Sequence, residues 1–144
     1  MKSSLQLLLV GALCTCTPAA EELTVTELCV YGNSGEGQVS FAAGAPLRVS
    51  LGTGTSGCRL PCDTVLSPPC TIVRDGHTFR VSGRLVVQRD CGGHKPPPAC
   101  SFPNIGCETE PVTAGDYVVT DGVRSLVVRV PQTRPNGSIP LCAR

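Results

Sequence analysis

The sequence predicts an all-β fold, an antiparallel β-sandwich, on the basis of three observations. Thirteen prolines and sixteen glycines are spread along the 144 residues, so that no stretch of roughly a dozen residues keeps the 3.6-residue apolar period of a helix. Short runs rich in β-branched residues recur instead. Two of these runs lead into Asp-Gly pairs, which favour tight hairpin turns.

The first strands are expected in the N-terminal third of the chain. Residues 23–31 are rich in β-branched side chains, and residues 33–37 are polar and glycine-containing, as in a loop. Two further strands are expected over residues 38–41 and 46–51. In the last of these, Leu47, Val49 and Leu51 alternate with polar residues, and they should therefore share one face of a sheet.

A first hairpin is expected over residues 71–81, with Asp75 and Gly76 as a two-residue turn. This turn would place Ile72 opposite Phe79. A third strand, over residues 84–88, is expected to continue this hairpin.

A second hairpin is expected over residues 116–130, with Asp-Gly at its turn. It would place Tyr117 opposite Leu126. The valines at 119, 128 and 130 would lie on the same face as Tyr117. Val118 and Val127 would lie on the other face, so we expect this pair of strands to be covered on both sides.

The segment from Pro111 through this hairpin to Pro131 resembles the final strand pair of many immunoglobulin-like domains. The resemblance covers about twenty residues and implies an immunoglobulin-like sandwich of about seven strands. No cysteine stands two residues after Tyr117, where antibody-type domains have one, so their inter-sheet disulfide is not expected.

The N-terminus has the features of a signal peptide over residues 1–20. Lys2 precedes an apolar run over residues 5–13, and small residues follow at Ala19 and Ala20. The run is too short to span a bilayer, which needs about 20 residues in a helix. We therefore expect export, without a transmembrane span, of a single domain over residues 21–144.

Residues 13–16, Leu-Cys-Thr-Cys, resemble a bacterial lipoprotein box. Lipidation of Cys16 would tether the protein to a membrane surface. Threonine before that cysteine departs from the usual small residue, and cleavage near Ala19 or Ala20 is the alternative.

Eight of the ten cysteines remain after removal of residues 1–20, and an even number in an exported chain predicts four disulfides. Their pairing stays open. The eight residues are Cys29, Cys58, Cys62, Cys70, Cys91, Cys100, Cys107 and Cys142.

Charge and motifs exclude several classes of function. Residues 21–144 carry eleven basic and eleven acidic side chains with no basic block, which argues against nucleic acid as a partner. The pair Cys91 and His94 has a metal-like spacing, but oxidised cysteines cannot ligate a metal. The only histidines, His77 and His94, stand in no recognisable triad pattern. We therefore expect no cofactor, no metal and no catalytic site.

The stretch from Asp90 to Pro111 is the least regular part of the sequence, and we expect a loop stapled by three cysteines. Loops held on a rigid scaffold bind partners at a lower entropic cost. The expected function is a non-catalytic binding or structural module at the cell surface or in the periplasm, with an unidentified protein or envelope component as partner. The candidate contact residues are His94, Lys95, Pro96, Pro97, Pro98 and Phe102.

Two alternatives remain open. A protease inhibitor would present the same loop, with Lys95 entering the specificity pocket of the protease. Pro96 directly after Lys95 makes the bond between them a poor scissile bond. A periplasmic redox or metal-handling protein would need a labile disulfide or an unpaired thiol.

Overall fold

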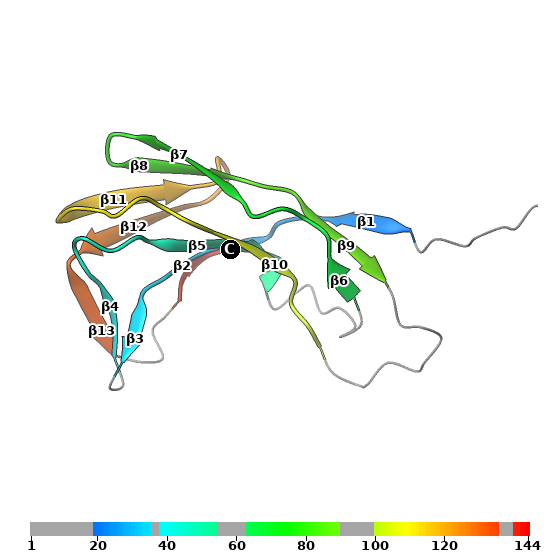
Figure 1. Ribbon diagram of the computed structural model, residues 1–144, viewed down its shortest axis with the longest axis horizontal. Coiled ribbons are helices and arrows are strands. Elements are labelled where there is room, and N and C mark those ends of the chain that lie inside the picture. The colour runs from blue at the N-terminus through cyan, green and yellow to red at the C-terminus, as the bar shows by residue number, and fades with distance from the viewer. Residues whose placement is uncertain (1–18, 36–37, 55–62, 90–99, 136–139) are drawn as a thin grey trace, which may run out of the picture.

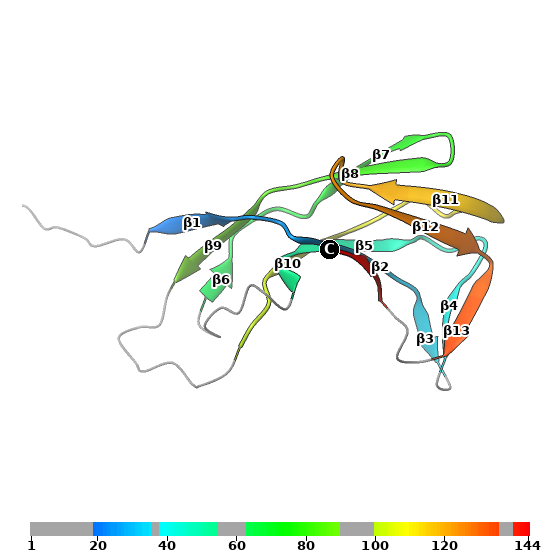
Figure 2. The ribbon, with the colours of Figure 1, turned by 180° about the vertical axis from the view of Figure 1, so that it is seen from behind.

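The computed structural model describes residues 19–35, 38–54, 63–89, 100–135 and 140–144. These residues form short strands (Figures 1 and 2). The strands are β1 (Ala20–Leu23), β2 (Glu27–Tyr31), β3 (Asn33–Gly35), β4 (Gln38–Phe41), β5 (Arg48–Gly52), β6 (Asp63–Val65), β7 (Thr71–Asp75), β8 (Thr78–Ser82), β9 (Leu85–Arg89), β10 (Asn104–Glu108), β11 (Gly115–Thr120), β12 (Ser125–Val130), β13 (Gln132–Pro135) and β14 (Leu141–Ala143). The all-β prediction is confirmed. None of these described segments forms a helix long and apolar enough to cross a membrane.

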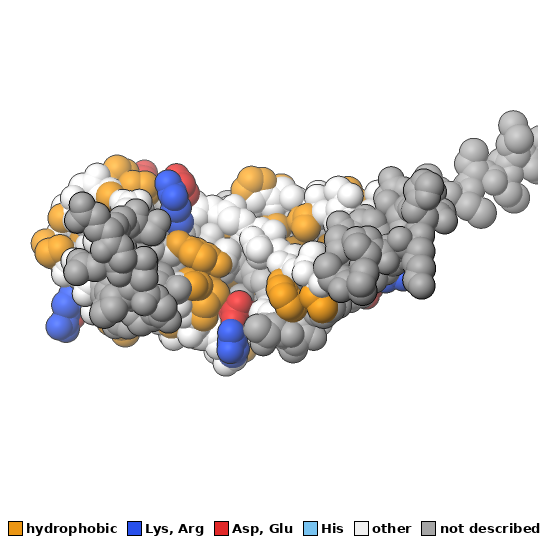
Figure 3. Space-filling model, turned by 90° about the horizontal axis from the view of Figure 1, so that it is seen from below, with side chains coloured by type: hydrophobic (Ala, Val, Ile, Leu, Met, Phe, Trp, Pro, Cys, Tyr) orange, Lys and Arg blue, Asp and Glu red, His pale blue; other side chains and the backbone are white. Residues whose placement is uncertain are grey.

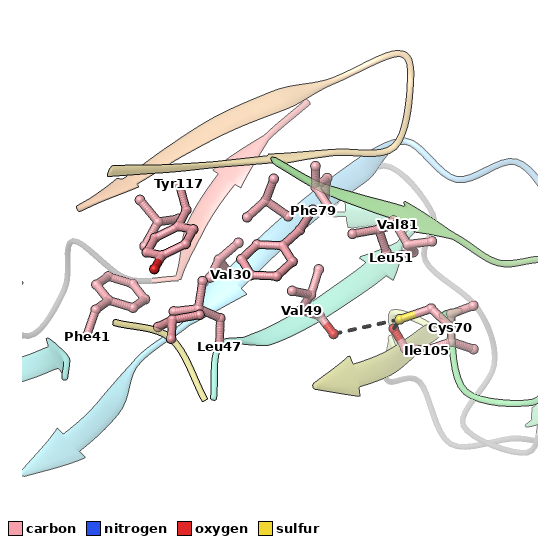
Figure 4. Close-up of a cluster of buried hydrophobic side chains, with 14 of the residues drawn as sticks. Val30, Phe41, Leu47, Val49, Leu51, Cys70, Phe79, Val81, Ile105 and Tyr117 are labelled. Atoms are coloured by element: carbon pink, nitrogen blue, oxygen red, sulfur yellow. Dashed lines mark hydrogen bonds between the residues drawn. The ribbon is translucent and has the colours of Figure 1, made fainter. Parts of the chain in front are cut away.

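Two four-stranded sheets face each other at the centre of the molecule (Figure 1). One has the strand order β12-β11-β8-β7 and the other has the order β10-β5-β2-β14. The core lies between them, and Figure 4 shows Phe79 and Tyr117 of the first sheet pointing toward Val30 and Val49 of the second. All four side chains are at most 2% exposed. Burial of their apolar surface is what holds the two sheets together.

The predicted alternation in residues 46–51 is confirmed. Leu47, Val49 and Leu51 are each 2% exposed and face the core, whereas Arg48 between them is exposed. Successive side chains of a strand point to opposite faces. This strand therefore gives one face to the core and the other to the outside of the molecule.

The two predicted hairpins form, but the predicted registers are wrong. Ile72 pairs with Val81 rather than with Phe79. Tyr117 pairs with Val128 rather than with Leu126. Both registers are shifted by two residues, so every side chain keeps its predicted face.

The turns explain the shifted registers. In the first hairpin Asp75 stays in the strand and pairs with Thr78, so the turn consists of Gly76, at φ 59°, and His77. Glycine adopts this left-handed backbone without a steric cost. In the second hairpin four residues, Asp121 to Arg124, form the loop instead of two.

Three further features of the strands differ from the expectation. The expected third strand is present as β9, but it pairs with β1 and β6 rather than with the strands of the first hairpin. Val127 is 65% exposed, so the second hairpin is not covered on both sides. The sheets are not purely antiparallel, because β8 and β11 run parallel to each other.

Residues 100–111, the described part of the predicted loop, are more regular than expected. Asn104–Glu108 form β10, an antiparallel partner of β5, and Ile105 within it is 4% exposed in the core. Pairing with a neighbouring strand satisfies backbone groups that an irregular loop would have to expose. Residues 90–99 lie outside the described part of the chain.

Two disulfides join strands that are far apart in the sequence. Cys29 in β2 bonds to Cys142 in β14, with the Cα atoms 4.1 Å apart. Cys70, just before β7, bonds to Cys107 in β10, with the Cα atoms 5.2 Å apart, and so links the two central sheets. Because an oxidised sulfur has no proton, the dashed line from Cys70 to Val49 in Figure 4 is best understood as a 4.0 Å contact.

The prediction of oxidised cysteines is therefore confirmed for five positions, since Cys100 is also disulfide-bonded. Cys58, Cys62 and Cys91 lie outside the described residues. The two disulfides fit an oxidising compartment.

Two smaller sheets extend the central pair at opposite ends. They have the orders β1-β9-β6 and β13-β4-β3. Figures 1 and 2 show that β3, β4 and β13 bend away at one end, and β6 at the other, toward the same side of the molecule. The outer face of sheet β10-β5-β2-β14 thus lies beneath an arch.

Candidate ligand-binding groove

The outer face of sheet β10-β5-β2-β14 is built from alternate residues of its strands. The neighbouring side chains form three rows across β10, β5 and β2, set by the strand register. The rows are Asn104–Gly52–Glu27, Gly106–Ser50–Cys29 and Glu108–Arg48–Tyr31. Larger side chains therefore surround a centre of small ones.

The small central residues make a hollow floor. Gly52, Gly106 and Ser50 line two adjoining hollows of about 570 Å³ and about 170 Å³. Both hollows border Ser50, which is 7% exposed at their base. Figure 3 looks onto this face, where hydrophobic and charged side chains surround a pale floor of backbone and small side chains. We name this concave face the groove.

The two glycines of the floor differ in how much space a side chain would have. A Cβ on Gly52 would lie 3.1 Å from the Cβ of Asn104 and 3.3 Å from the carbonyl oxygen of Pro103, so the close approach of β10 requires glycine there. A Cβ on Gly106 would meet only the carbonyl oxygen of Val49, at 3.7 Å, which is an ordinary contact. Packing therefore does not require glycine at 106, and its absence of a side chain opens the larger hollow.

Charged side chains at the margin of the groove are paired with one another. Arg48 Nε donates to Glu108 Oε1 at 3.1 Å, and both side chains are more than half exposed, at 62% and 57%. Arg144 Nε donates to Glu27 Oε1 at 2.6 Å. Each cation faces an anion, so these four residues give the groove no net charge.

Two aromatic rings border the smaller hollow with Gly52 and Gly54. Tyr31 is 38% exposed and Phe102 is 44% exposed, which is unusual for the largest apolar side chains of this chain. Tyr31 comes from β2 and Phe102 from the segment that leads into β10, so the fold places rings distant in sequence at one site. The Ser50 hydroxyl donates to the Tyr31 hydroxyl at 3.4 Å.

Of the predicted contact residues, Phe102 alone lies in the described part of the chain, and it borders the groove. His94, Lys95, Pro96, Pro97 and Pro98 lie outside the described residues, as does Cys16. The loop interpretation and the inhibitor alternative through Lys95 both remain predictions. The structure anchors the C-terminal end of this segment through Cys107.

His77, the other histidine considered above, is part of the fold. Its ring stacks on Tyr117 with the centroids 5.0 Å apart. Its Nδ1 lies 3.1 Å from the backbone carbonyl oxygen of Asp116, and since a carbonyl can only accept, Nδ1 carries the proton. The residue supports the end of the core and does not border the groove hollows.

The aspartates at turns have structural roles, as Asp121 illustrates. Burial by itself would raise the pKa of its carboxyl group, but the backbone N–H groups of Arg124 and Val123 and the Arg124 guanidinium outweigh burial and lower that pKa. Arg124 also donates from Nη2 to the carbonyl oxygen of Val25 at 2.7 Å. This hydrogen bond ties the second hairpin to the segment before β2.

One cluster of metal-ligating residue types exists among the described residues, formed by Glu27, Cys29 and Cys142. The two sulfurs are bonded to each other and cannot act as thiolate ligands. The Glu27 carboxylate is held by Arg144. We assign no metal to this cluster.

Sequence reasoning missed most of the groove. It did not single out Tyr31, Arg48, Ser50, Asn104 or Glu108 as site residues. The available signal was the outward-facing alternation of polar and small residues in β5 and β10, but β10 was not predicted as a strand.

Comparisons with protein-family models, with curated proteins and with solved structures found no match for this chain.

Proposed function

We propose that this chain is an exported, non-catalytic binding module that holds its ligand in the groove. The observation that carries the proposal is the floor of small residues, Gly52, Gly106 and Ser50, beneath exposed rings. A concave surface with a few convergent polar groups is the usual form of a ligand site. A rigid sheet also positions those groups before the ligand arrives, which lowers the entropic cost of binding.

The absence of catalysis is proposed from the chemistry of the groove. Among its described residues, the hydroxyl of Ser50 contacts another hydroxyl, that of Tyr31, and no imidazole. The carboxylates of Glu27 and Glu108 are paired with arginines. A nucleophile needs a nearby base and a general acid needs a proton at working pH. These paired groups are suited to hydrogen bonding rather than to proton transfer.

The proposed fold within the all-β class is an immunoglobulin-like sandwich. The Tyr117 hydroxyl donates to the carbonyl oxygen of Thr113, four residues earlier, at 3.0 Å. A tyrosine that bonds back to the chain just upstream is typical of the last strands of such domains. The Cys70–Cys107 disulfide links the two sheets at their edge, away from Tyr117.

The proposed location is the cell surface or periplasm, after removal of residues 1–20 or after lipidation at Cys16. The oxidised cysteines support this location. The proposed partner is an envelope component.

Filling the groove tests the proposal. Gly106→Val places a branched side chain over the larger hollow, at a position where a Cβ makes an ordinary contact. Ser125→Val is the matched control, because it adds the same side chain to the outer face of the opposite sheet. The melting temperature of each disulfide-bonded protein is measured with a panel of oligosaccharides, peptides, nucleosides and amino acids.

The expected result is a ligand class that stabilises the natural protein and Ser125→Val but not Gly106→Val. A ligand at about 100 times its Kd stabilises a protein by about 2.7 kcal/mol, a shift that is readily measured. If no class stabilises the natural protein, or if Gly106→Val responds equally, the groove is not the binding site.

A further inference from the structure

We propose that the ligand of the groove is a neutral oligosaccharide of the cell envelope. This inference rests on the proposed function and adds the chemical class of the ligand. It is carried by three features of the groove: its paired charges, its exposed rings and its supply of both hydrogen-bond donors and acceptors.

The paired charges favour an uncharged ligand. Arg48 faces Glu108 and Arg144 faces Glu27, so the four residues offer no net charge to an anion or a cation. A charged ligand would meet one opposite and one like charge at each pair, so neither sign gains a net attraction from these four residues. A hydroxyl group can instead accept from the arginine and donate to the glutamate of the same pair without separating them.

The rings favour a ligand with an apolar face. Tyr31 and Phe102 border the smaller hollow, with Gly52 and Gly54 beside them. An aromatic ring carries negative charge on its face and positive charge at its edge. The C–H groups on one face of a sugar ring are slightly positive and flat enough to lie against such a ring.

Hydrogen-bonding groups surround these rings. The Tyr31 hydroxyl accepts from Ser50, so its own proton is directed elsewhere. The Asn104 amide nitrogen donates to the carbonyl oxygen of Phe102 at 3.3 Å, which leaves its amide oxygen as an acceptor at the groove. These groups match hydroxyls that both donate and accept.

A peptide fits this surface less well. Peptides usually add to the edge of a sheet, where backbone groups are free to pair. The groove lies on the face of the sheet, and its central strand, β5, is paired on both sides, with β10 and β2. A peptide lying over the two hollows would therefore face side chains, because the nearest backbone edge of this sheet among the described strands is the outer side of β10, beside the groove. Two adjoining hollows suit a chain of linked sugar rings.

The test uses neutral gluco-, manno-, galacto- and xylo-oligosaccharides of two to six units, titrated calorimetrically into the disulfide-bonded protein. Tyr31→Ala should weaken binding at least tenfold, and Tyr31→Phe, which keeps the ring, by less than about fivefold. Val127→Ala, on the exposed face of the other sheet, should leave binding unchanged. Tyrosine emission adds a second readout, because the chain has two tyrosines and no tryptophan and Tyr117 is buried.

The outcomes separate this inference from the proposed function. Oligosaccharide binding that is lost in both Tyr31→Ala and Gly106→Val, with a Tyr31-dependent change in emission, supports it. Binding of peptides or anionic polysaccharides alone, blocked by Gly106→Val, overturns the oligosaccharide class and leaves the groove as a site. Oligosaccharide binding that neither variant weakens overturns the inference, and absence of any groove ligand overturns both proposals.

Discussion

Removal of the Cys70–Cys107 disulfide should destabilise the fold strongly. The perturbation is the double substitution Cys70→Ala and Cys107→Ala, which avoids leaving a reactive thiol. The two cysteines are separated by 37 residues. Because the disulfide closes a loop of that size in the unfolded chain, its removal should lower the free energy of unfolding by about 4 kcal/mol.

The matched comparison is the pair Cys29→Ala and Cys142→Ala. These cysteines are 113 residues apart, so the same reasoning gives a loss of about 5 kcal/mol. Total stability of a small domain is about 5–15 kcal/mol. Either loss is therefore a large fraction of what holds this aromatic-poor core together.

The assay is equilibrium unfolding in guanidinium chloride, followed by far-ultraviolet circular dichroism. The unfolding midpoint should fall in both variants, and it should fall further for the 113-residue loop. A loss below about 1 kcal/mol for the 37-residue loop would refute the idea that the disulfides act by restricting the unfolded chain. A larger loss for the shorter loop would show that native contacts of Cys70 dominate instead.

Three further predictions concern packing, hydrogen bonding and charge. Gly83→Ala should lower the free energy of unfolding by about 1–3 kcal/mol, because the new Cβ would lie 2.6 Å from Cδ1 of the buried Ile105 and 3.2 Å from Cβ of the disulfide-bonded Cys70. Tyr117→Phe should lower the free energy of unfolding by about 1 kcal/mol, because it removes the hydroxyl that donates to the carbonyl oxygen of Thr113. The pKa of Asp121 is lower in the folded than in the unfolded chain. The contribution of Asp121 to stability is therefore present above about pH 3.9 and is lost as pH falls through the lower folded value. Asp121→Asn should reduce the acid slope, by which we mean the decrease in the free energy of unfolding as pH falls through this range.

Each prediction has a result that contradicts it. Gly106→Ala, whose Cβ has room, is the control for Gly83→Ala, and equal losses in the two would contradict the packing argument. An unchanged free energy of unfolding in Tyr117→Phe would show that the hydroxyl bonds to water in the unfolded chain as favourably as it bonds to Thr113 in the fold. An unchanged acid slope in Asp121→Asn would assign that slope to other carboxylates, such as Glu22 and Asp116, whose pKa values are also lowered by arginine partners.

The features that could be predicted from the sequence are those set by local alternation. Leu47, Val49 and Leu51 share a face because a strand has a two-residue period. The shifted hairpin registers preserve the predicted faces for the same reason. The registers themselves depend on turn hydrogen bonds, such as those that Asp121 accepts from Val123 and Arg124, and these are not visible in an Asp-Gly pair alone.

The parts that could not be predicted depend on contacts between distant segments. β10 contains one large apolar residue, Ile105, and it is a strand because it pairs with β5 and is bonded to Cys70. The parallel pairing of β8 with β11 has no local signal either. The groove combines residues of β2, β5 and β10, so it becomes visible only when these strands are placed side by side.

The central claim is that the outer face of sheet β10-β5-β2-β14 binds the ligand. A nuclear magnetic resonance titration of the ¹⁵N-labelled, disulfide-bonded protein tests it, with the neutral oligosaccharide that binds most tightly in the calorimetric series as the probe. If the ligand binds in the groove, the largest amide shifts fall at Tyr31, Ser50, Asn104 and Gly106. Shifts concentrated around Val127 on the opposite sheet, with Gly106 unchanged, would contradict it.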